Sequence, residues 1–170
     1  MKSSNTKIEI CPCLFGNYNV VFGDFRNPGD GQWDVTKSCQ WIKDHEVGCG
    51  KVRRGCGSGW CARHVRCAME AGGMSTNGRP NWAWKYVDYL PQKGFEHIYD
   101  LKRGDTSFTP RTGDIACYQQ NNNPKVAGHI CMYVGGNINK WVSDFIQNSV
   151  FVYNSTNVAH IFRYRGKTIS

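Results

Sequence analysis

The feature that most limits the fold of this chain is residues 55–73, GCGSGWCARHVRCAMEAGG, where a glycine-rich segment runs directly into a helical pattern. At 100° per residue, one face of this pattern collects small and apolar side chains and the other collects charged ones. The apolar face consists of Cys61, Val65, Ala68, Met69 and Gly72, and the charged face of Arg63, Arg66 and Glu70. The pattern predicts a helix that begins at Cys61, with this cysteine facing inward, and the following Gly72-Gly73 pair predicts its end.

A cysteine in the first turn of a helix is suited to nucleophilic chemistry. A thiol reacts as the thiolate, and its pKa falls at a helix N-terminus or beside a protonated imidazole. The unpaired backbone N–H groups of the first turn can also stabilise the oxyanion of an acyl-transfer intermediate. We therefore expect Cys61 to be a nucleophile, which needs a histidine as its base. His64 shares the helix with Cys61, and we expect it to flank the site.

Among the five histidines, His129 is the best candidate for the base. It opens the segment GHICMYVGGNINKWVSDF, which can form a β-hairpin with residues 136–137, Gly-Asn, as a two-residue turn. In that register His129 lies opposite Asp144 on the same face, so the carboxylate would orient the imidazole. A register slip of one residue would turn Asp144 to the other face and leave Gln147 or Asn148 as the third residue.

The whole chain, residues 1–170, is expected to form one domain, with its motifs between about 55 and 165. Residues 1–50 carry no motif that we match, and they predict short strand and loop together with a helix from Val35 to His45 that has Asp34 or Thr36 at its N-cap. A further helix is expected over 81–90, where Pro91 ends it.

From Gly113 onward the pattern changes to segments typical of strands. These segments are 114–119, 129–135, 140–146, 149–154 and 159–165. Helices followed by strands predict the α+β class, with N-terminal helices packed on an antiparallel β-sheet.

The nine cysteines are more than a protein of a reducing compartment usually carries. Apart from Cys61 they are expected to be structural, with no pairing predicted. Cys56, Cys61, His64 and Cys67 are an alternative set of zinc ligands, although their spacing differs from that of common zinc sites. Taken singly, Cys61 could also be a small core residue and Asp144 a solvated carboxylate.

The net charge of +8 favours an anionic partner such as nucleic acid, a membrane or a bacterial wall polymer, and charge alone does not choose among these. The basic residues are scattered and no nucleic-acid-binding motif is present, which argues against a nucleic-acid partner. No apolar run is long enough to insert in a membrane, and the first residues, MKSSNTKIEICPC, lack the apolar core of a secretory signal. We expect a monomer made in the cytoplasm without a signal peptide, which leaves by a non-classical route.

Four motifs together resemble the CHAP and NlpC-type cysteine peptidases and amidases, a papain-like superfamily that acts on bacterial peptidoglycan. These are GWCARHVRCAMEAGG for the nucleophile helix, TGDIACY for the entering strand, GHICMYVGG for the histidine strand and WVSDFIQ for the third polar residue. The resemblance implies Cys61 as nucleophile, His129 as general base and then acid, and Asp144 as orienting residue. Trp60 and Ser58, just before the nucleophile, would line the substrate groove. The implied reaction hydrolyses an amide bond of a stem peptide or cross-link through an acyl-enzyme, without metal or cofactor.

The compact domain and the expected lack of a signal peptide resemble amidase effectors that bacteria inject into a rival's periplasm by type VI secretion. That resemblance implies a peptidoglycan peptide as substrate, with a cognate immunity protein and the secretion machinery as partners. Action in the periplasm or cell wall of a target bacterium also fits the cysteine content, because that compartment is oxidising. Two alternatives stay open: a phage-type lysin of the same chemistry, and a non-enzymatic, disulfide-rich binding protein in which Cys61 is buried or bridged.

Overall fold

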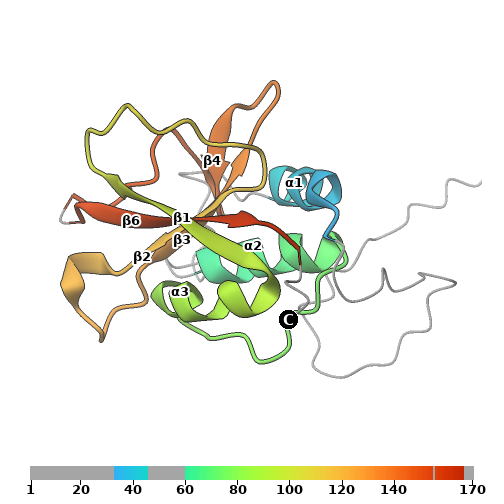
Figure 1. The fold of residues 1–170 in the computed structure, drawn as a ribbon, viewed down its shortest axis with the longest axis horizontal. Helices are drawn as coiled ribbons and strands as arrows, with labels where there is room; N and C mark the ends of the chain where they lie inside the picture. The colour runs from blue at the N-terminus through green and yellow to red at the C-terminus, as the bar shows by residue number, and fades with distance from the viewer. Residues whose placement is uncertain (1–32, 46–59, 155, 167–170) are drawn as a thin grey trace, which may run out of the picture.

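The computed structural model describes residues 33–45, 60–154 and 156–166 (Figure 1). The helices in these ranges are α1 (Val35–Asp44), α2 (Cys61–Ala71) and α3 (Tyr86–Tyr89), with short 3-10 turns η2 (Ala83–Lys85), η3 (Pro91–Lys93) and η4 (Gln120–Asn122). The strands are β1 (Phe95–Lys102), β2 (Ile115–Tyr118), β3 (His129–Val134), β4 (Lys140–Val142), β5 (Ile146–Gln147) and β6 (Val158–Tyr164). Among the described helices, none combines the length and apolarity needed to cross a bilayer.

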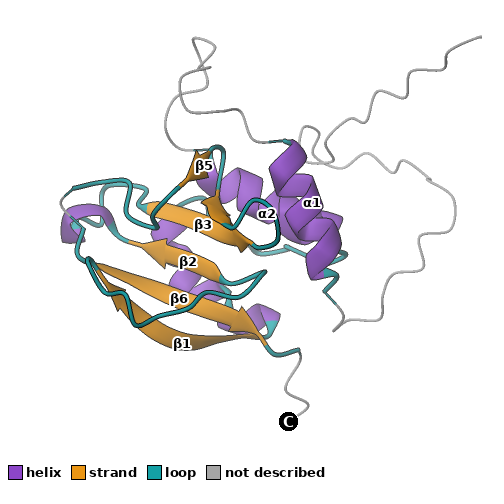
Figure 2. Ribbon diagram, turned by 90° about the horizontal axis from the view of Figure 1, so that it is seen from above, coloured by secondary structure: helices purple, strands orange, loops and turns teal. Residues whose placement is uncertain are grey.

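The six strands form one sheet in the order β1-β6-β2-β3-β4-β5, and every neighbouring pair is antiparallel. Figure 2 shows β1, β6, β2 and β3 side by side, with α1 and α2 next to the β3 end of the sheet. Helix α2 packs on both α1 and β3. The expected α+β class with helices on an antiparallel sheet is therefore confirmed, and α2 lies between α1 and β3 in its contacts.

The central strands β2 and β3 are buried on both faces because each face carries its own apolar cluster. The cluster on the helix side includes Ile115, Cys117, Ile130, Met132, Val65 and Met69. The cluster on the other side includes Ala116, Tyr118, Cys131, Trp141, Val150 and Ile161. Side chains alternate between the two faces along a strand, so β2 and β3 each contribute residues to both clusters.

Helices α1 and α2 begin at the predicted residues, and α1 ends at Asp44, one residue before its predicted end. Asp34 caps α1, because its carboxylate accepts a hydrogen bond from the backbone N–H of Lys37 at 3.0 Å. Helix α2 begins at Cys61 and ends before Gly72, whose N–H donates to the carbonyl of Ala68 at 3.1 Å. The predicted charged face of α2 is less open than expected, since the side chain of Arg66 is only 13% exposed.

The prediction of one continuous helix over 81–90 is wrong, because this segment is divided into short helical turns. The segment consists of η2, a four-residue α3 and then η3, with Tyr86, Tyr89 and Leu90 buried and Trp82 37% exposed. Pro91 opens η3 instead of ending the helix, because the first turn of a helix tolerates a residue without an N–H. Gly94 ends the segment in the left-handed conformation with φ 84°.

The prediction of a strand over 149–154 is also wrong. Conversely, strand β1 forms over a segment for which no strand was predicted. The backbone of 149–154 bonds to side chains instead of a neighbouring strand: Tyr118 accepts from the N–H of Val152 at 3.1 Å. Strand β1, FEHIYDLK, lacks a clean apolar alternation because it is an edge strand with mixed burial.

The predicted register of the β3–β4 hairpin is wrong by one residue. Met132 pairs with Val142 and Val134 pairs with Lys140, so the partner numbers add to 274, where the two-residue turn required 273. The connection is a five-residue loop, 135–139, in which Gly136 (φ 65°) and Asn139 (φ 48°) adopt positive φ. This slip decides which polar side chain reaches His129.

Candidate active site

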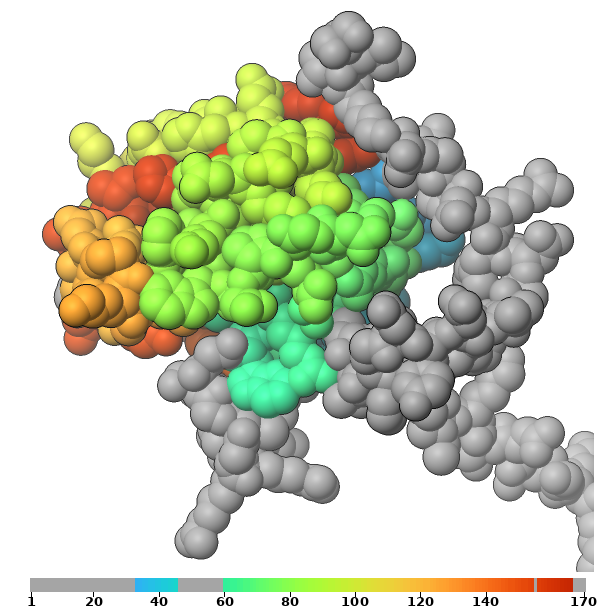
Figure 3. Space-filling view, turned by 90° about the horizontal axis from the view of Figure 1, so that it is seen from below, coloured from blue at the N-terminus to red at the C-terminus, as the bar shows by residue number. Residues whose placement is uncertain are grey.

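Cys61 is the first residue of α2 and is 4% exposed. Helix α2 packs on β3, and the backbone of Ile130, the residue after His129, hydrogen-bonds to the Cys61 thiol. The helix start and the strand start therefore meet, as the sequence predicts for a cysteine–histidine site. The beginning of α2 reaches the molecular surface beside the segment that follows the helix (Figure 3).

His129 is the first residue of β3 and is 2% exposed. Its Nε2 donates a hydrogen bond to Oε1 of Gln147 at 2.9 Å. The orientation of the Gln147 amide follows from its other bonds, because its Nε2 donates to the carbonyls of Ser149 at 2.8 Å and Val150 at 3.3 Å. Since Oε1 can only accept, the neutral imidazole carries its proton on Nε2 and keeps a lone pair on Nδ1.

Three aromatic rings surround the imidazole. Ring centroids of Tyr118, Phe145 and Tyr153 lie 5.6, 6.0 and 6.1 Å from that of His129. Burial lowers the pKa of His129, an effect opposed by the hydrogen bond to Gln147 and the charge of Asp144. The result is an imidazole that is neutral at neutral pH, as a proton acceptor must be.

The Cys61 thiol is protonated at rest. Burial raises its pKa to about 11, and the charge of Asp144 adds to this, whereas backbone hydrogen bonds from Ile130, Ala62 and Cys61 itself lower it. The Cys61 thiol and the His129 imidazole are therefore both neutral at rest. A thiol of this kind becomes a nucleophile when its proton passes to a base.

Asp144 lies in the turn between β4 and β5 and is half-buried. Its charge acts on Cys61, His129 and Tyr153, so it is close to the site. The position expected for it, as hydrogen-bond partner of the imidazole, is taken by Gln147, one of the two residues expected after a one-residue slip. The physical cause is the β3–β4 register, which differs by one residue from the predicted one.

The remaining predicted residues lie around this centre or outside the described residues. Asn148, the other alternative, accepts a hydrogen bond from Lys140 at 2.7 Å and is exposed. Trp60 precedes Cys61, and the guanidinium of Arg63 lies 4.4 Å from the centroid of the Trp60 ring. His64 bonds back to the carbonyl of Trp60 through Nδ1 at 3.1 Å, and its place beside the site stays a prediction. Ser58 lies outside the described residues.

The cysteines that the structure describes fall into two classes. Cys39, Cys61, Cys117 and Cys131 are buried thiols, and Cys67 is disulfide-bonded. A sulfur in a disulfide does not act as a thiolate ligand, so the alternative zinc site loses Cys67. The positions Cys11, Cys13, Cys49 and Cys56 lie outside the described residues.

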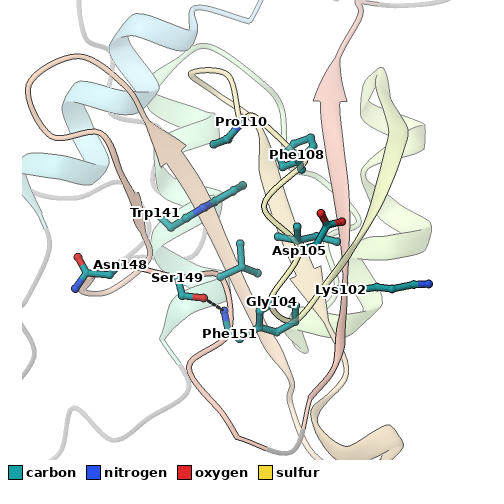
Figure 4. Close-up of a pocket in the computed structure, with 11 residues that line it drawn as sticks. Lys102, Gly104, Asp105, Phe108, Pro110, Trp141, Asn148, Ser149 and Phe151 are labelled. Carbon is teal, nitrogen blue, oxygen red and sulfur yellow. Dashed lines mark hydrogen bonds between the residues drawn. The ribbon is translucent and has the colours of Figure 1, made fainter.

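Figure 4 draws the residues that line a hollow, whose volume is about 190 Å³. Its lining includes Asp105, Phe108, Trp141, Asn148, Ser149 and Phe151. The carbonyls of Ser149 and Val150 hold the Gln147 amide, and both residues line the hollow. One wall of the hollow is therefore continuous with the residues that fix His129.

No protein-family model matches the chain, and no curated protein matches it significantly. A chain in the crystal structure of the type VI native effector–immunity complex Tae3–Tai3 from Ralstonia pickettii has a TM-score of 0.55 and 21% identity, covering 78% of this chain and 100% of that chain. A chain in the selenomethionine structure of the same kind of complex has a TM-score of 0.44 and 23% identity, covering 65% of this chain and 80% of that chain. The first match shows that this protein shares its fold with a chain of a type VI effector–immunity complex.

Proposed function

We propose that the protein is a cysteine-dependent amidase that hydrolyses amide bonds in peptidoglycan peptides, with Cys61 as nucleophile, His129 as base and Gln147 as orienting residue. The observation that carries this proposal is the hydrogen bond from His129 Nε2 to Gln147 Oε1 at the strand start that meets the thiol-bearing helix. A nucleophile, a base and a residue that fixes the tautomer of the base are the three parts that such a reaction needs.

In the first half-reaction, Nδ1 of His129 accepts the proton of the Cys61 thiol as sulfur attacks the substrate carbonyl. Gln147 Oε1 accepts from Nε2 in both the neutral and the protonated ring, so it supports the imidazolium that forms. The C–N bond then breaks, the imidazolium donates its proton to the leaving amine, and an acyl-enzyme remains.

In the second half-reaction, His129 accepts a proton from water, and the resulting hydroxide attacks the thioester carbonyl. The C–S bond breaks, and the proton returns from the imidazolium to the Cys61 sulfur. Both tetrahedral intermediates carry an oxyanion, for which the unpaired N–H groups at the start of α2 are suitable donors. Two of these amides, those of Cys61 and Ala62, already donate hydrogen bonds to the thiol.

The substrate class and the setting of the proposal rest on the shared fold. The matching chain belongs to a type VI effector–immunity complex, which supports an antibacterial effector that acts on the target cell wall and a cognate immunity protein as partner. The net charge of +8 suits a polyanionic wall. Papain-like chemistry of the CHAP and NlpC type is part of the proposal.

One observation favours the alternative of a non-enzymatic binding protein. Cys61 is only 4% exposed, and burial raises its pKa to about 11, as for a core cysteine. The two functions differ in the fate of the bound peptidoglycan. An amidase cleaves it and needs Cys61 to do so, whereas a binding protein leaves it intact.

The test incubates purified protein and the Cys61→Ala variant with isolated Gram-negative sacculi and identifies released fragments by mass spectrometry. The proposal expects fragments from the wild type alone, and the masses of their new termini identify the bond cleaved. Equal binding to sacculi by both proteins, with no fragments from either, would instead support the binding protein.

A further inference from the structure

A cluster of three metal-ligating side chains lies away from the cysteine, on the outer pair of strands. Oδ1 of Asp100 is 2.9 Å from Nε2 of His97 and 2.8 Å from Nδ1 of His160. The three ligand atoms all lie within 4.8 Å of one another. The side chains are 43%, 55% and 38% exposed for His97, Asp100 and His160, so an ion can reach them from solvent.

A β-bulge brings His97 and Asp100 to one face of the sheet. Residues three apart on a regular strand point to opposite faces. Here the register shifts between His97 and Tyr99, so that His97 pairs with Phe162 and Asp100 pairs directly with His160. Positions 160 and 162 of β6 share a face, so their partners in β1 share it as well. Without the bulged residue, Ile98, the three ligands would not converge.

We propose that His97, Asp100 and His160 bind a divalent transition metal ion, with zinc as the first candidate. Two imidazole nitrogens and one carboxylate oxygen form the donor set that zinc, nickel and copper accept, whereas calcium and magnesium require oxygen ligands. Three protein ligands leave one position of a tetrahedral zinc site for water. The site uses none of the residues in the proposed catalytic set, so it does not depend on that function.

The two distances from Asp100 Oδ1 to the imidazole nitrogens are close to those of a zinc site. Zinc–ligand bonds of about 2.0–2.1 Å in a tetrahedron separate ligand atoms by about 3.3 Å, only slightly more than the two N–O distances observed here. Both rings now direct a nitrogen at the same carboxylate oxygen. The ion would replace the protons that the rings share with this oxygen.

The direct test is calorimetric titration of tag-free, full-length protein with zinc chloride. We expect one zinc per chain, and a loss of affinity of at least tenfold in His97→Ala and in Asp100→Asn. The double variant His97→Ala/His160→Ala should lose the site. The matched control is His45→Ala, which removes an imidazole that stacks on Trp41 and lies far in sequence from the three ligands. This variant should leave zinc affinity unchanged.

Two further measurements separate this site from zinc bound by thiols or from a folding defect. Cobalt(II) added to the wild type should give visible bands without the near-ultraviolet sulfur-to-cobalt band, and the Cys61→Ala variant should give the same spectrum. Zinc should raise the Tm of the wild type but not of Asp100→Asn, because the ion joins the edge strand β1 to β6. A sulfur band in the wild type, or unchanged zinc affinity in the double variant, would overturn the proposal.

Discussion

Gln147 holds His129 by one directional hydrogen bond, from imidazole Nε2 to amide Oε1 at 2.9 Å. The amide cannot turn over without losing its own bonds to the carbonyls of Ser149 and Val150. Gln147 therefore sets both the orientation and the tautomer of the ring. Asp144, the carboxylate nearby, acts on His129 through its charge.

This relationship predicts that Gln147→Ala lowers kcat by about 10²–10³-fold with little change in KM, because the imidazole loses its orienting partner and a buried N–H is left without an acceptor. The matched variant Asp144→Asn should cost less than about tenfold, since it removes a charge and leaves the hydrogen bond. Steady-state kinetics on a soluble stem-peptide substrate measures both. The reverse ranking would assign the orienting role to Asp144.

Cys61 should react slowly with iodoacetamide at neutral pH, since only about one thiol in ten thousand is ionised four pH units below its pKa. With its pKa at about 11, the labelling rate should rise close to tenfold for each unit between pH 7 and pH 10. Labelling is followed on the Cys61 peptide by mass spectrometry, with Cys61→Ala identifying the signal. A rate that is constant from pH 6 to pH 9 would indicate a preformed thiolate–imidazolium pair and contradict a thiol that is neutral at rest.

The sequence predicted the parts of the site that local patterns determine. Cys61 at the start of α2 and His129 at the start of β3 follow from helical periodicity and from strand composition, and the structure brings the two elements together. The residue that hydrogen-bonds to His129 depends on the register of the β3–β4 hairpin. That register changes with a difference of one residue in the glycine- and asparagine-rich loop. The choice of Gly136 and Asn137 as a two-residue turn was plausible locally, and the five-residue loop with Asn139 at positive φ replaced it.

Long-range pairing also explains why β1 and the bulge at Ile98 were not predicted. Strand β1 is irregular in its own sequence pattern, and its partner is β6, which lies far along the chain. No local pattern reports a side chain re-aimed by a bulge in an edge strand. The convergence of His97, Asp100 and His160 is accordingly visible only in the folded chain.

The buried, neutral imidazole predicts the acid side of the pH profile. Burial lowers the pKa of His129 below its ordinary 6.5, so the imidazole is still neutral at pH 6.5. The value of kcat/KM should therefore stay high down to pH 6.5 and fall only at lower pH. Asp144 raises the pKa of His129, so Asp144→Asn should move the acid limb to still lower pH. The measurement is kcat/KM between pH 4 and pH 8 for both proteins. An acid limb above pH 6.5 would mean that the base is not this imidazole.

The same shift makes folding stability depend on pH. The unfolded chain binds a proton at His129 near pH 6.5, whereas the folded chain does so only at lower pH, so the free energy of unfolding falls as the pH drops through 6.5. His129→Asn should lessen this fall. Urea unfolding of both proteins at pH 5 and pH 7.5 gives the comparison, and equal falls would show that His129 does not contribute.

The ion pair between Asp114 and Arg163 joins the start of β2 to β6 and predicts a large effect on stability. Arg163 donates through Nε to Oδ1 at 2.8 Å and through a terminal nitrogen to Oδ2 at 2.7 Å, and Asp114 is 1% exposed. Removing one partner of a buried pair leaves the other charge without compensation, so Asp114→Ala should lower the free energy of unfolding by about 3–5 kcal/mol. The matched control is Glu96→Ala, which breaks the exposed pair with Arg165 and should cost no more than about 1 kcal/mol. Urea titration of the three proteins measures the difference, and similar losses in both variants would mean that burial does not govern the contribution of Asp114.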